Sequence, residues 1–212
     1  RQAGYKTYIH HGSYKDVVRL EDEIFNVGSD LVGVTTFTET FNETIRLCLR
    51  IKDRRPTVHV CLGGHLASLH YVEILRDFSF VDSIIVGEGD QTLPALIEAL
   101  CSGGSIKECR GVAYRENGNV RFTGLRAPVD DLDALPFPAR DQMNNIGLRS
   151  ARIVTSRGCT GHCTFCSWPA FRSLTRSKAW RGRSPKSVVM EMRQLRESGV
   201  EAIAFVDSTF ED

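Results

Sequence analysis

Hydrophobic positions in the first hundred residues follow two alternating spacings. Short apolar or β-branched runs are typical of strands, and apolar residues three or four apart are typical of one helix face. The expected strands cover residues 5–10, 31–36, 57–62 and 81–86. The expected helices between them carry four apolar sets: Val17, Leu20, Ile24 and Val27; Phe41, Ile45 and Cys48; Tyr71, Val72 and Leu75; and Leu93, Leu96, Ile97 and Leu100. This alternation predicts an α/β fold with a doubly wound parallel sheet and helices on both faces.

Three loops after these strands carry residues suited to a ligand. They are Thr35-Thr36-Phe37, Gly63-Gly64-His65 and Gly87-Glu88-Gly89. Each alone is typical of an ordinary turn, but loops after parallel strands share one edge of the sheet, where ligands bind. Glycines there let a ligand approach the backbone, and hydroxyls supply hydrogen bonds. No Gly-x-Gly-x-x-Gly opens a helix after these strands, which disfavours a dinucleotide, while a Rossmann-like or flavodoxin-like fold with another ligand stays open.

The segment from residue 103 to 150 predicts a hairpin followed by a linker. Two short alternating runs flank Asn117-Gly118, a dipeptide that accepts the positive φ angles of a tight turn. Pro128, Pro136 and Pro138 then interrupt an acidic stretch, and prolines remove backbone donors. We therefore expect the domain boundary in this segment.

A three-cysteine loop carries the strongest chemical signal of the chain. A short expected strand at residues 153–156 leads into the spacing Cys159-x3-Cys163-x2-Cys166. Three thiolates on one loop hold three corners of a [4Fe-4S] cluster and leave the fourth iron open for substrate chemistry. Gly158 and Gly161 let the chain wrap the cluster with amides toward its sulfurs. The alternatives are a zinc site with His162 as fourth ligand, and three unconnected cysteines.

The residues after this loop predict one further helix and one strand. Ser184-Pro185 is typical of a helix start, an apolar face follows, and the helix is expected to end near Gly199. Residues 202–206 are the expected strand. The other cysteines, Cys48, Cys61, Cys101 and Cys109, have no ligand spacing and are interpreted as ordinary small apolar residues.

Composition and charge narrow the function classes. The chain has 212 residues, 42% hydrophobic and 25% charged, which excludes a disordered chain. A net charge of +1 gives no global reason to expect nucleic acid or an anionic membrane as partner, and no apolar run is long enough to span a membrane. Seven cysteines, an odd number, favour reduced thiols and a cytoplasmic location. Nine Lys and Arg and no Asp or Glu lie between Gln142 and Met190, which favours an anionic centre there.

The cysteine loop resembles the signature of the radical SAM superfamily, including the aromatic Phe165 before the last cysteine. The segments 180–185 and 205–210 resemble the first helix and second strand of a radical SAM barrel. The resemblance implies that the open iron chelates S-adenosylmethionine and that Phe165 lies near its adenine. It also implies a contact between the amino group of S-adenosylmethionine and Asp207 or Ser208.

The first half of the chain resembles cobalamin-binding domains, on Thr35-x-Phe37 followed by Gly63-Gly64. Residues 81–90 and the linker at 130–138 resemble B12 domains that precede radical SAM domains. The resemblance implies that the three loops described above line the cobalamin slot. The Asp-x-His-x-x-Gly motif, which supplies a lower cobalt ligand in some relatives, is absent from this chain.

Together the two resemblances imply a fragment truncated at both ends. Residues 1–110 would form a cobalamin-binding domain without its first strand, 111–150 the hairpin and linker, and 151–212 the start of a partial (β/α)6 barrel. The whole enzyme would transfer a methyl group from methylcobalamin to an unactivated carbon of a small-molecule or peptide substrate, with an electron donor such as flavodoxin or ferredoxin. The isolated fragment would be inactive. The alternatives are a cyclase or rearrangement enzyme, and a non-catalytic cobalamin or iron-sulfur module.

Overall fold

The structure, a computed structural model, describes residues 4–10, 17–140 and 149–210. The chain divides into two compact units, Arg1–Arg126 and Ala127–Asp212. No helix in the described ranges is both long and apolar enough to cross a membrane. Residues 141–148 of the expected linker lie outside the described residues.

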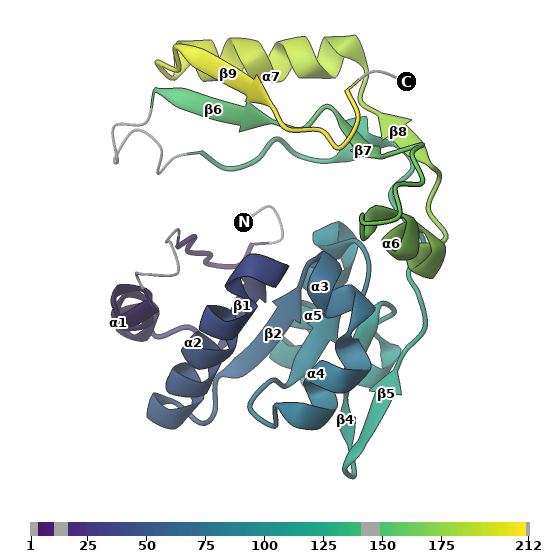
Figure 1. The fold of residues 1–212 in the computed structure, drawn as a ribbon. Coiled ribbons are helices and arrows are strands. Elements are labelled where there is room, and N and C mark those ends of the chain that lie inside the picture. The colour runs from purple at the N-terminus through teal and green to yellow at the C-terminus, as the bar shows by residue number, and fades with distance from the viewer. Residues whose placement is uncertain (1–3, 11–16, 141–148, 211–212) are drawn as a thin grey trace. The chain divides into compact units, whose positions relative to one another are not determined.

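The first unit is built on a mixed sheet (Figure 1). Its described strands follow the order β1 (Leu31–Thr35), β2 (His59–Gly63), β3 (Ser83–Ile85), β4 (Val112–Glu116) and β5 (Asn119–Phe122). The strands β1, β2 and β3 are parallel, as predicted, and the hairpin β4–β5 adds to β3 in the antiparallel sense. The hairpin has the expected tight turn, because Asn117 and Gly118 have φ angles of 50° and 78°. The sequence placed this hairpin beside the linker, whereas in the structure it extends the sheet.

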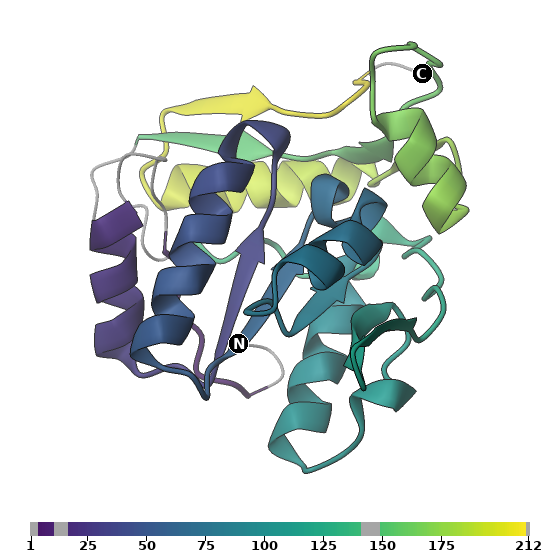
Figure 2. The same cartoon turned by 60° about the horizontal axis from the view of Figure 1, so that its bottom comes forward.

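Helices cover both faces of this sheet, as the alternating pattern predicted. In chain order they are α1 (Val17–Val27), α2 (Phe41–Arg54), α3 (His65–Leu69), α4 (Tyr71–Asp77) and α5 (Gly89–Cys101). In Figure 1, α2, α3 and α4 lie in front of the strands and α5 lies behind them, and Figure 2 shows the same layers from below. One core cluster joins α5 to the strands through the buried residues Cys61, Ile85, Leu96, Cys109 and Val112.

The expected strand at residues 5–10 is wrong, because this segment has no regular structure. A strand needs a neighbour to pair its backbone, and β1 is the edge strand of the described sheet. A cavity of about 620 Å³ lies between residues 8–10 and β1. Tyr8, Ile9 and His10 line it together with all of β1. Residues of α1 and α2 complete its walls.

The second unit starts with two parallel strands joined through a helix (Figure 1). They are β6 (Ser150–Ile153) and β9 (Ala202–Phe205), and α7 (Pro185–Glu197) lies between them in the chain. Ser184 caps α7, as expected, by accepting a hydrogen bond from the Ser187 N–H at 3.1 Å. Ala151, Ile153 and Leu195 form one buried core cluster of this unit.

A second, antiparallel strand pair carries the cysteine loop. The pair is β7 (Ser156–Gly158) with β8 (Trp180–Gly182), and α6 (Trp168–Thr175) lies between them in the chain. The expected single strand at 153–156 is therefore wrong: β6 ends at Ile153 and a new strand begins at Ser156. The sequence also missed α6, a two-turn helix too short for its apolar spacing to be distinctive.

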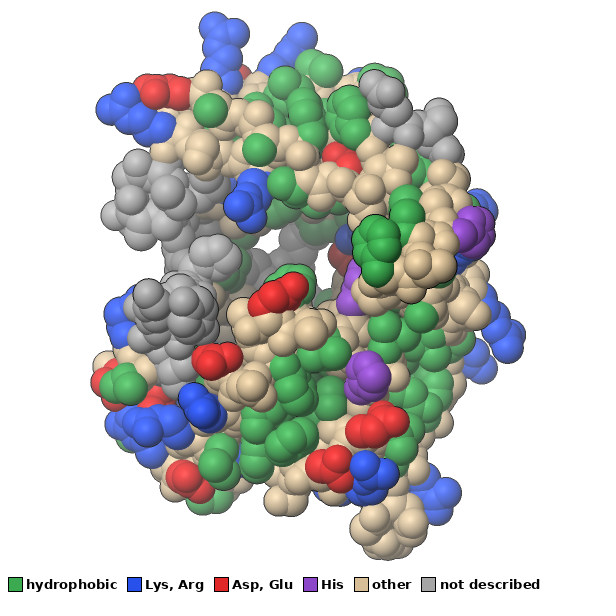
Figure 3. Space-filling view, in the orientation of Figure 1, with side chains coloured by type: hydrophobic (Ala, Val, Ile, Leu, Met, Phe, Trp, Pro, Cys, Tyr) green, Lys and Arg blue, Asp and Glu red, His purple; other side chains and the backbone are tan. Residues whose placement is uncertain are grey.

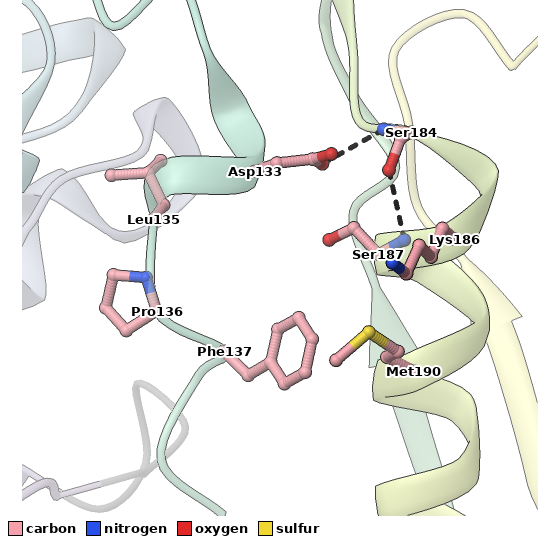
Figure 4. A pocket seen from close by; sticks show the side chains of 8 residues that line it. All are labelled: Asp133, Leu135, Pro136, Phe137, Ser184, Lys186, Ser187 and Met190. Carbon is pink, nitrogen blue, oxygen red and sulfur yellow. Dashed lines mark hydrogen bonds between the residues drawn. The ribbon is translucent and has the colours of Figure 1, made fainter.

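Residues 133–137 of the expected linker pack on the start of α7 (Figure 4). The Asp133 carboxylate accepts a hydrogen bond from the Ser184 N–H at 3.0 Å. Hydrogen bonding by the Ser184 side chain, and then by its backbone N–H, lowers the pKa of Asp133. Asp133, Phe137 and Met190 line a cavity of about 340 Å³, in which Phe137 points toward Met190. The Arg183 guanidinium lies 5.2 Å from the Phe137 ring centroid. These contacts pack residues 133–137 against α7 within the second unit.

Candidate functional site

The first two predicted loops of the sheet edge lie in direct contact. The Thr36 hydroxyl donates to the Gly63 carbonyl at 2.8 Å and accepts from the Ala67 N–H at 3.0 Å. The Thr36 N–H donates to the same carbonyl at 2.8 Å. Thr36 is fully buried, so its role is to join the β1 and β2 loops, while the neighbouring Thr35 and Phe37 are exposed. The exposed residues are the ones that a ligand can reach.

Gly64 lies where the loop after β2 comes close to the loop after β1. Its φ angle is +96°, a left-handed conformation that favours glycine. A Cβ at this position would lie 2.9 Å from the Thr36 carbonyl oxygen and 3.0 Å from Thr35 Oγ1. The next residue, His65, begins α3 and is half-buried, and this burial lowers its pKa. At neutral pH its imidazole is therefore uncharged.

The third loop is tied to the second through Ser68, which the sequence analysis missed. The Ser68 hydroxyl lies in α3, accepts from the Gly87 N–H at 3.1 Å and donates to the Ile85 carbonyl at 3.4 Å. Glu88 and Gly89 follow at the N-terminus of α5, and both are half-buried. The structure thus brings all three loops together at the carboxyl edge of β1, β2 and β3. A small hydroxyl three residues after a loop histidine gives no signal by itself.

The cysteine loop starts from a tightly fixed stem. Gly158 has a φ angle of +114°, and a Cβ there would lie 2.1 Å from the Ala179 carbonyl oxygen. The end of β7 therefore accepts no side chain against the start of β8. This contact fixes the point from which the loop with the three cysteines departs.

The three thiols lie at the surface of the loop with backbone amides directed to two of them. Cys163 and Cys166 are exposed and Cys159 is half-buried. The Gly161 N–H donates to Cys159 Sγ at 3.3 Å, and the Trp168 N–H donates to Cys166 Sγ at 3.4 Å. A Cβ on Gly161 would lie 3.3 Å from Cys159 Sγ and 3.9 Å from Cys163 Sγ, so this glycine opens space between two sulfurs. Amide-to-sulfur hydrogen bonds and a glycine cradle fit an iron-sulfur cluster.

No group of three His, Cys, Asp or Glu side chains in the described ranges is gathered around one point as a single metal ion requires. A zinc ion binds each sulfur at about 2.3 Å, whereas a cluster binds each thiolate through a different iron and therefore accepts wider sulfur spacing. His162 Nε2 lies 2.9 Å from an Arg172 nitrogen. That ring nitrogen therefore faces a guanidinium group and not the cysteines.

Arg172 directly contacts the cysteine loop, and its position in the sequence alone did not distinguish it from the other cations. Besides His162, its guanidinium donates to the Cys159 carbonyl at 3.5 Å. Other cations of the acid-free segment pair with acids outside it: Arg149 with Glu201, Lys178 with Asp130 and Arg183 with the buried Glu191. Figure 3 shows Lys and Arg side chains that project from the α7 side of the second unit. Several cations of the acid-free segment therefore form ion pairs within the fold.

The carboxylate of Asp207, which follows β9, contacts the backbone between β6 and β7. Its Oδ1 accepts from the Thr155 N–H at 2.7 Å and the Ser156 N–H at 2.5 Å, and lies 2.9 Å from Ser156 Oγ. This carboxylate oxygen thus holds the break between β6 and β7. Its Oδ2 is buried and has no hydrogen-bond partner among the described residues. The next residue, Ser208, is exposed.

The remaining thiols and Phe165 differ sharply in exposure. Phe165 is 91% exposed. Cys48 and Cys61 are buried, and this burial raises their pKa values to about 12 and about 11, which makes them unreactive. Cys109 is also buried, whereas Cys101 is exposed.

Comparison with known proteins gives one matching family and several relatives. The B12 binding domain family matches residues 1–97. An uncharacterized methyltransferase of Pyrococcus horikoshii is 30% identical over 93% of this chain and 43% of its own length. An anaerobic magnesium-protoporphyrin IX monomethyl ester cyclase of Rubrivivax gelatinosus is 28% identical over 89% of this chain and 37% of its own length. The chain thus spans about two fifths of the length of these relatives.

A solved structure shares the fold. The radical S-adenosylmethionine methyltransferase TsrM of Kitasatospora setae, with cobalamin and a [4Fe-4S] cluster bound, superposes with a TM-score of 0.70 at 19% identity. The match covers 91% of this chain and 40% of that protein. It supports the α/β fold with a parallel core that the sequence predicted.

Proposed function

We propose that this chain carries the cofactor-binding part of an enzyme that transfers a methyl group to an unactivated carbon. The chain is a homologue of B12-dependent radical SAM methyltransferases and cyclases. The observation that carries the proposal is the cysteine loop, with Gly161 set between two of its sulfurs and amides directed to Cys159 and Cys166. The B12 binding domain match to residues 1–97 adds the second cofactor. The relatives are longer, so the complete reaction belongs to a longer protein.

Cobalamin is assigned to the carboxyl edge of the first sheet. Thr35, Phe37 and Gly63 would face the cofactor, because Thr36 is buried and fully hydrogen-bonded within the protein. Gly64, His65 and the loop Gly87-Glu88-Gly89 would form the rest of the slot, since Ser68 holds these loops together. The uncharged, half-buried His65 suits an apolar wall of the slot.

The cluster is assigned to Cys159, Cys163 and Cys166, and S-adenosylmethionine to the adjacent strand ends. The unpartnered Oδ2 of Asp207 would accept a hydrogen bond from the amino group of S-adenosylmethionine, since a buried carboxylate oxygen needs a donor. The exposed Ser208 hydroxyl is the second candidate. Phe165 has a fully accessible ring face, which suits stacking on adenine.

The chemistry of the two cofactors defines what the protein must do. When bound, the cluster supplies the electron that cleaves S-adenosylmethionine, and methylcobalamin supplies the methyl group. The chain contributes by fixing positions: Asp207 Oδ1 and the Gly158 contact hold the stem of the cysteine loop. Arg172 adds a positive charge beside a loop that carries three thiolates, which stabilises the ionised sulfurs.

Product analysis of the full-length protein tests the proposed reaction. With reductant, S-adenosylmethionine and methylcobalamin, we expect 5′-deoxyadenosine and a product heavier than its substrate by one methylene unit. The mass of the product is measured with methylcobalamin labelled in its methyl group. Deoxyadenosine without a gain in mass favours the cyclase or rearrangement alternative, which the similarity to the Rubrivivax gelatinosus cyclase supports. Binding of both cofactors without any deoxyadenosine favours a non-catalytic module.

The edge strand β1 of the first sheet supports one part of the domain organisation expected from the sequence, a cobalamin-binding domain without its first strand. We propose that the groove between residues 4–10 and β1 holds the missing first strand of the cobalamin-binding domain, supplied by polypeptide outside this chain. The Asp30 carbonyl and the Thr36 N–H pair with β2. Because backbone groups alternate sides along a strand, Leu31, Gly33 and Thr35 point their N–H groups into the groove, where no described strand pairs with them.

Hydrogen exchange of β1 tests this placement residue by residue. In the present chain we expect the amides of Leu31, Gly33 and Thr35 to exchange fast, and those of Val32 and Val34 to be slow because they pair with β2. In the full-length protein the first three should slow by about a hundredfold, equal to about 2.8 kcal/mol of protection. The two inner amides are the internal control. Fast exchange at Leu31, Gly33 and Thr35 in the longer protein would contradict the missing strand.

Cellular context and partners follow from the same chemistry. None of the seven cysteines forms a disulfide bond in the described residues, which supports a reducing compartment such as the cytoplasm. A one-electron reductant, such as flavodoxin or ferredoxin, would supply electrons to the cluster. The substrate is a small molecule or a peptide, and no nucleic-acid partner is proposed because the net charge is +1.

A further inference from the structure

The sulfur of Cys159 has a side-chain neighbour that the proposed function leaves unused. The Thr209 hydroxyl donates a hydrogen bond to Cys159 Sγ at 2.9 Å. The two residues are 50 positions apart in the chain, and Thr209 follows β9 while Cys159 follows β7. This contact is therefore a product of the tertiary structure.

Thr209 is held in place by its own backbone. Its carbonyl oxygen accepts from Trp180 Nε1 at 3.4 Å and lies 3.1 Å from Ser156 Oγ. Ser156 Oγ has a single proton and also lies 2.9 Å from Asp207 Oδ1, so it serves one of these two acceptors at a time. The strands β7 and β8 thus both contact Thr209, which directs its hydroxyl to the sulfur.

Cys159 is also the cysteine at which such a bond has the largest effect. It is half-buried, whereas Cys163 and Cys166 are exposed. A hydrogen bond is electrostatically stronger where water is partly excluded. Cys166 receives a bond from a backbone amide, while Cys159 receives one from the Gly161 amide and a second from the Thr209 side chain.

We propose that Thr209 is a positioning residue for the cluster, whose hydroxyl donates to the Cys159 sulfur and thereby raises the reduction potential of the cluster. The proposal rests on the proposed function, because it requires a [4Fe-4S] cluster on Cys159. When one electron enters the cluster from an external reductant, negative charge on the sulfurs increases. A donor to a sulfur stabilises this reduced state more than the oxidised state.

A redox titration of the full-length protein, followed by electron paramagnetic resonance after anaerobic reconstitution, tests the proposal. Thr209→Val has nearly the same shape without the donor, and Thr209→Ser keeps the donor. We expect Thr209→Val to lower the one-electron reduction equilibrium constant by about tenfold, which is about 59 mV. Thr209→Ser should titrate like the wild type. Equal potentials for wild type and Thr209→Val would overturn the proposal.

Assembly of the cluster gives a second readout if the valine variant does not take up iron. Thr209→Ala then replaces it in the titration. If both the valine and alanine variants lose the cluster and Thr209→Ser retains it, the hydroxyl is confirmed as the positioning group. If Thr209→Ser loses the cluster as well, the proposal is wrong, because the donor does not rescue assembly. A wild-type protein without a [4Fe-4S] cluster would instead refute the proposed function itself.

Discussion

Cys163→Ala loses the brown iron-sulfur absorption after anaerobic reconstitution. Iron and sulfide should fall from about four of each per chain to near zero, since the variant retains only two thiolates of the loop for a cluster that needs three. Cys163 is exposed, so its replacement should change the free energy of unfolding by no more than about 0.5 kcal/mol. The measurements are the absorption spectrum, iron and sulfide analysis, and thermal unfolding of the protein before reconstitution.

Cys101→Ala is the matched control for this experiment. Cys101 is also an exposed cysteine, but it lies at the end of α5 and outside the loop. Its replacement should leave the iron content unchanged. An unaltered spectrum and iron content in Cys163→Ala would remove the cluster assignment. One zinc ion per chain in anaerobically purified wild type would support the zinc alternative instead.

Gly63→Leu weakens cobalamin uptake by the first unit. A side chain at the carboxyl edge of β2 would occupy part of the slot that Thr35 and Phe37 also face, and overpacking a well-fitted site costs about 1–3 kcal/mol. The dissociation constant should therefore rise by about 5- to 150-fold. A Cβ at Gly63 would meet no atom closer than 4.0 Å, so the backbone at this position accepts a Cβ without a clash. Equilibrium binding of aquacobalamin, followed by its absorption, measures the change.

The neighbouring glycine shows why the choice of position matters. A bulky residue at Gly64 should also block cobalamin, but the φ of +96° and the close Thr36 carbonyl mean that it would strain the fold as well. Gly63→Ala is the graded control and should reduce uptake less than Gly63→Leu. Normal uptake by Gly63→Leu, with unchanged thermal unfolding, would contradict the cobalamin placement.

Local patterns predicted most elements of the first unit. The helices α1, α2 and α5 follow the apolar spacing, and Asn117-Gly118 makes the expected turn. The pattern failed at residues 5–10 and 153–156, where apolar residues in sequence did not become one strand. Strand formation depends on a partner for the backbone, which periodicity does not contain. For residues 5–10 no partner is present in the described sheet, and at residue 155 the backbone donates to Asp207 instead.

Residue type and spacing are enough to predict the α/β architecture, the three loops at the sheet edge and the three cysteines of the loop. These depend on residue type and spacing within about ten positions, which act through local backbone geometry. Other features depend on how the chain folds: the Thr36 hydroxyl is buried in hydrogen bonds within the protein, and Ser68 joins two loops. Likewise, Asp207 contacts the stem of the cysteine loop and Thr209 contacts the sulfur of Cys159. Those contacts join residues 19 to 51 positions apart. Their partners are set by strand register and packing, because a short hydroxyl or carboxylate bonds whichever group the fold brings within 3 Å or so.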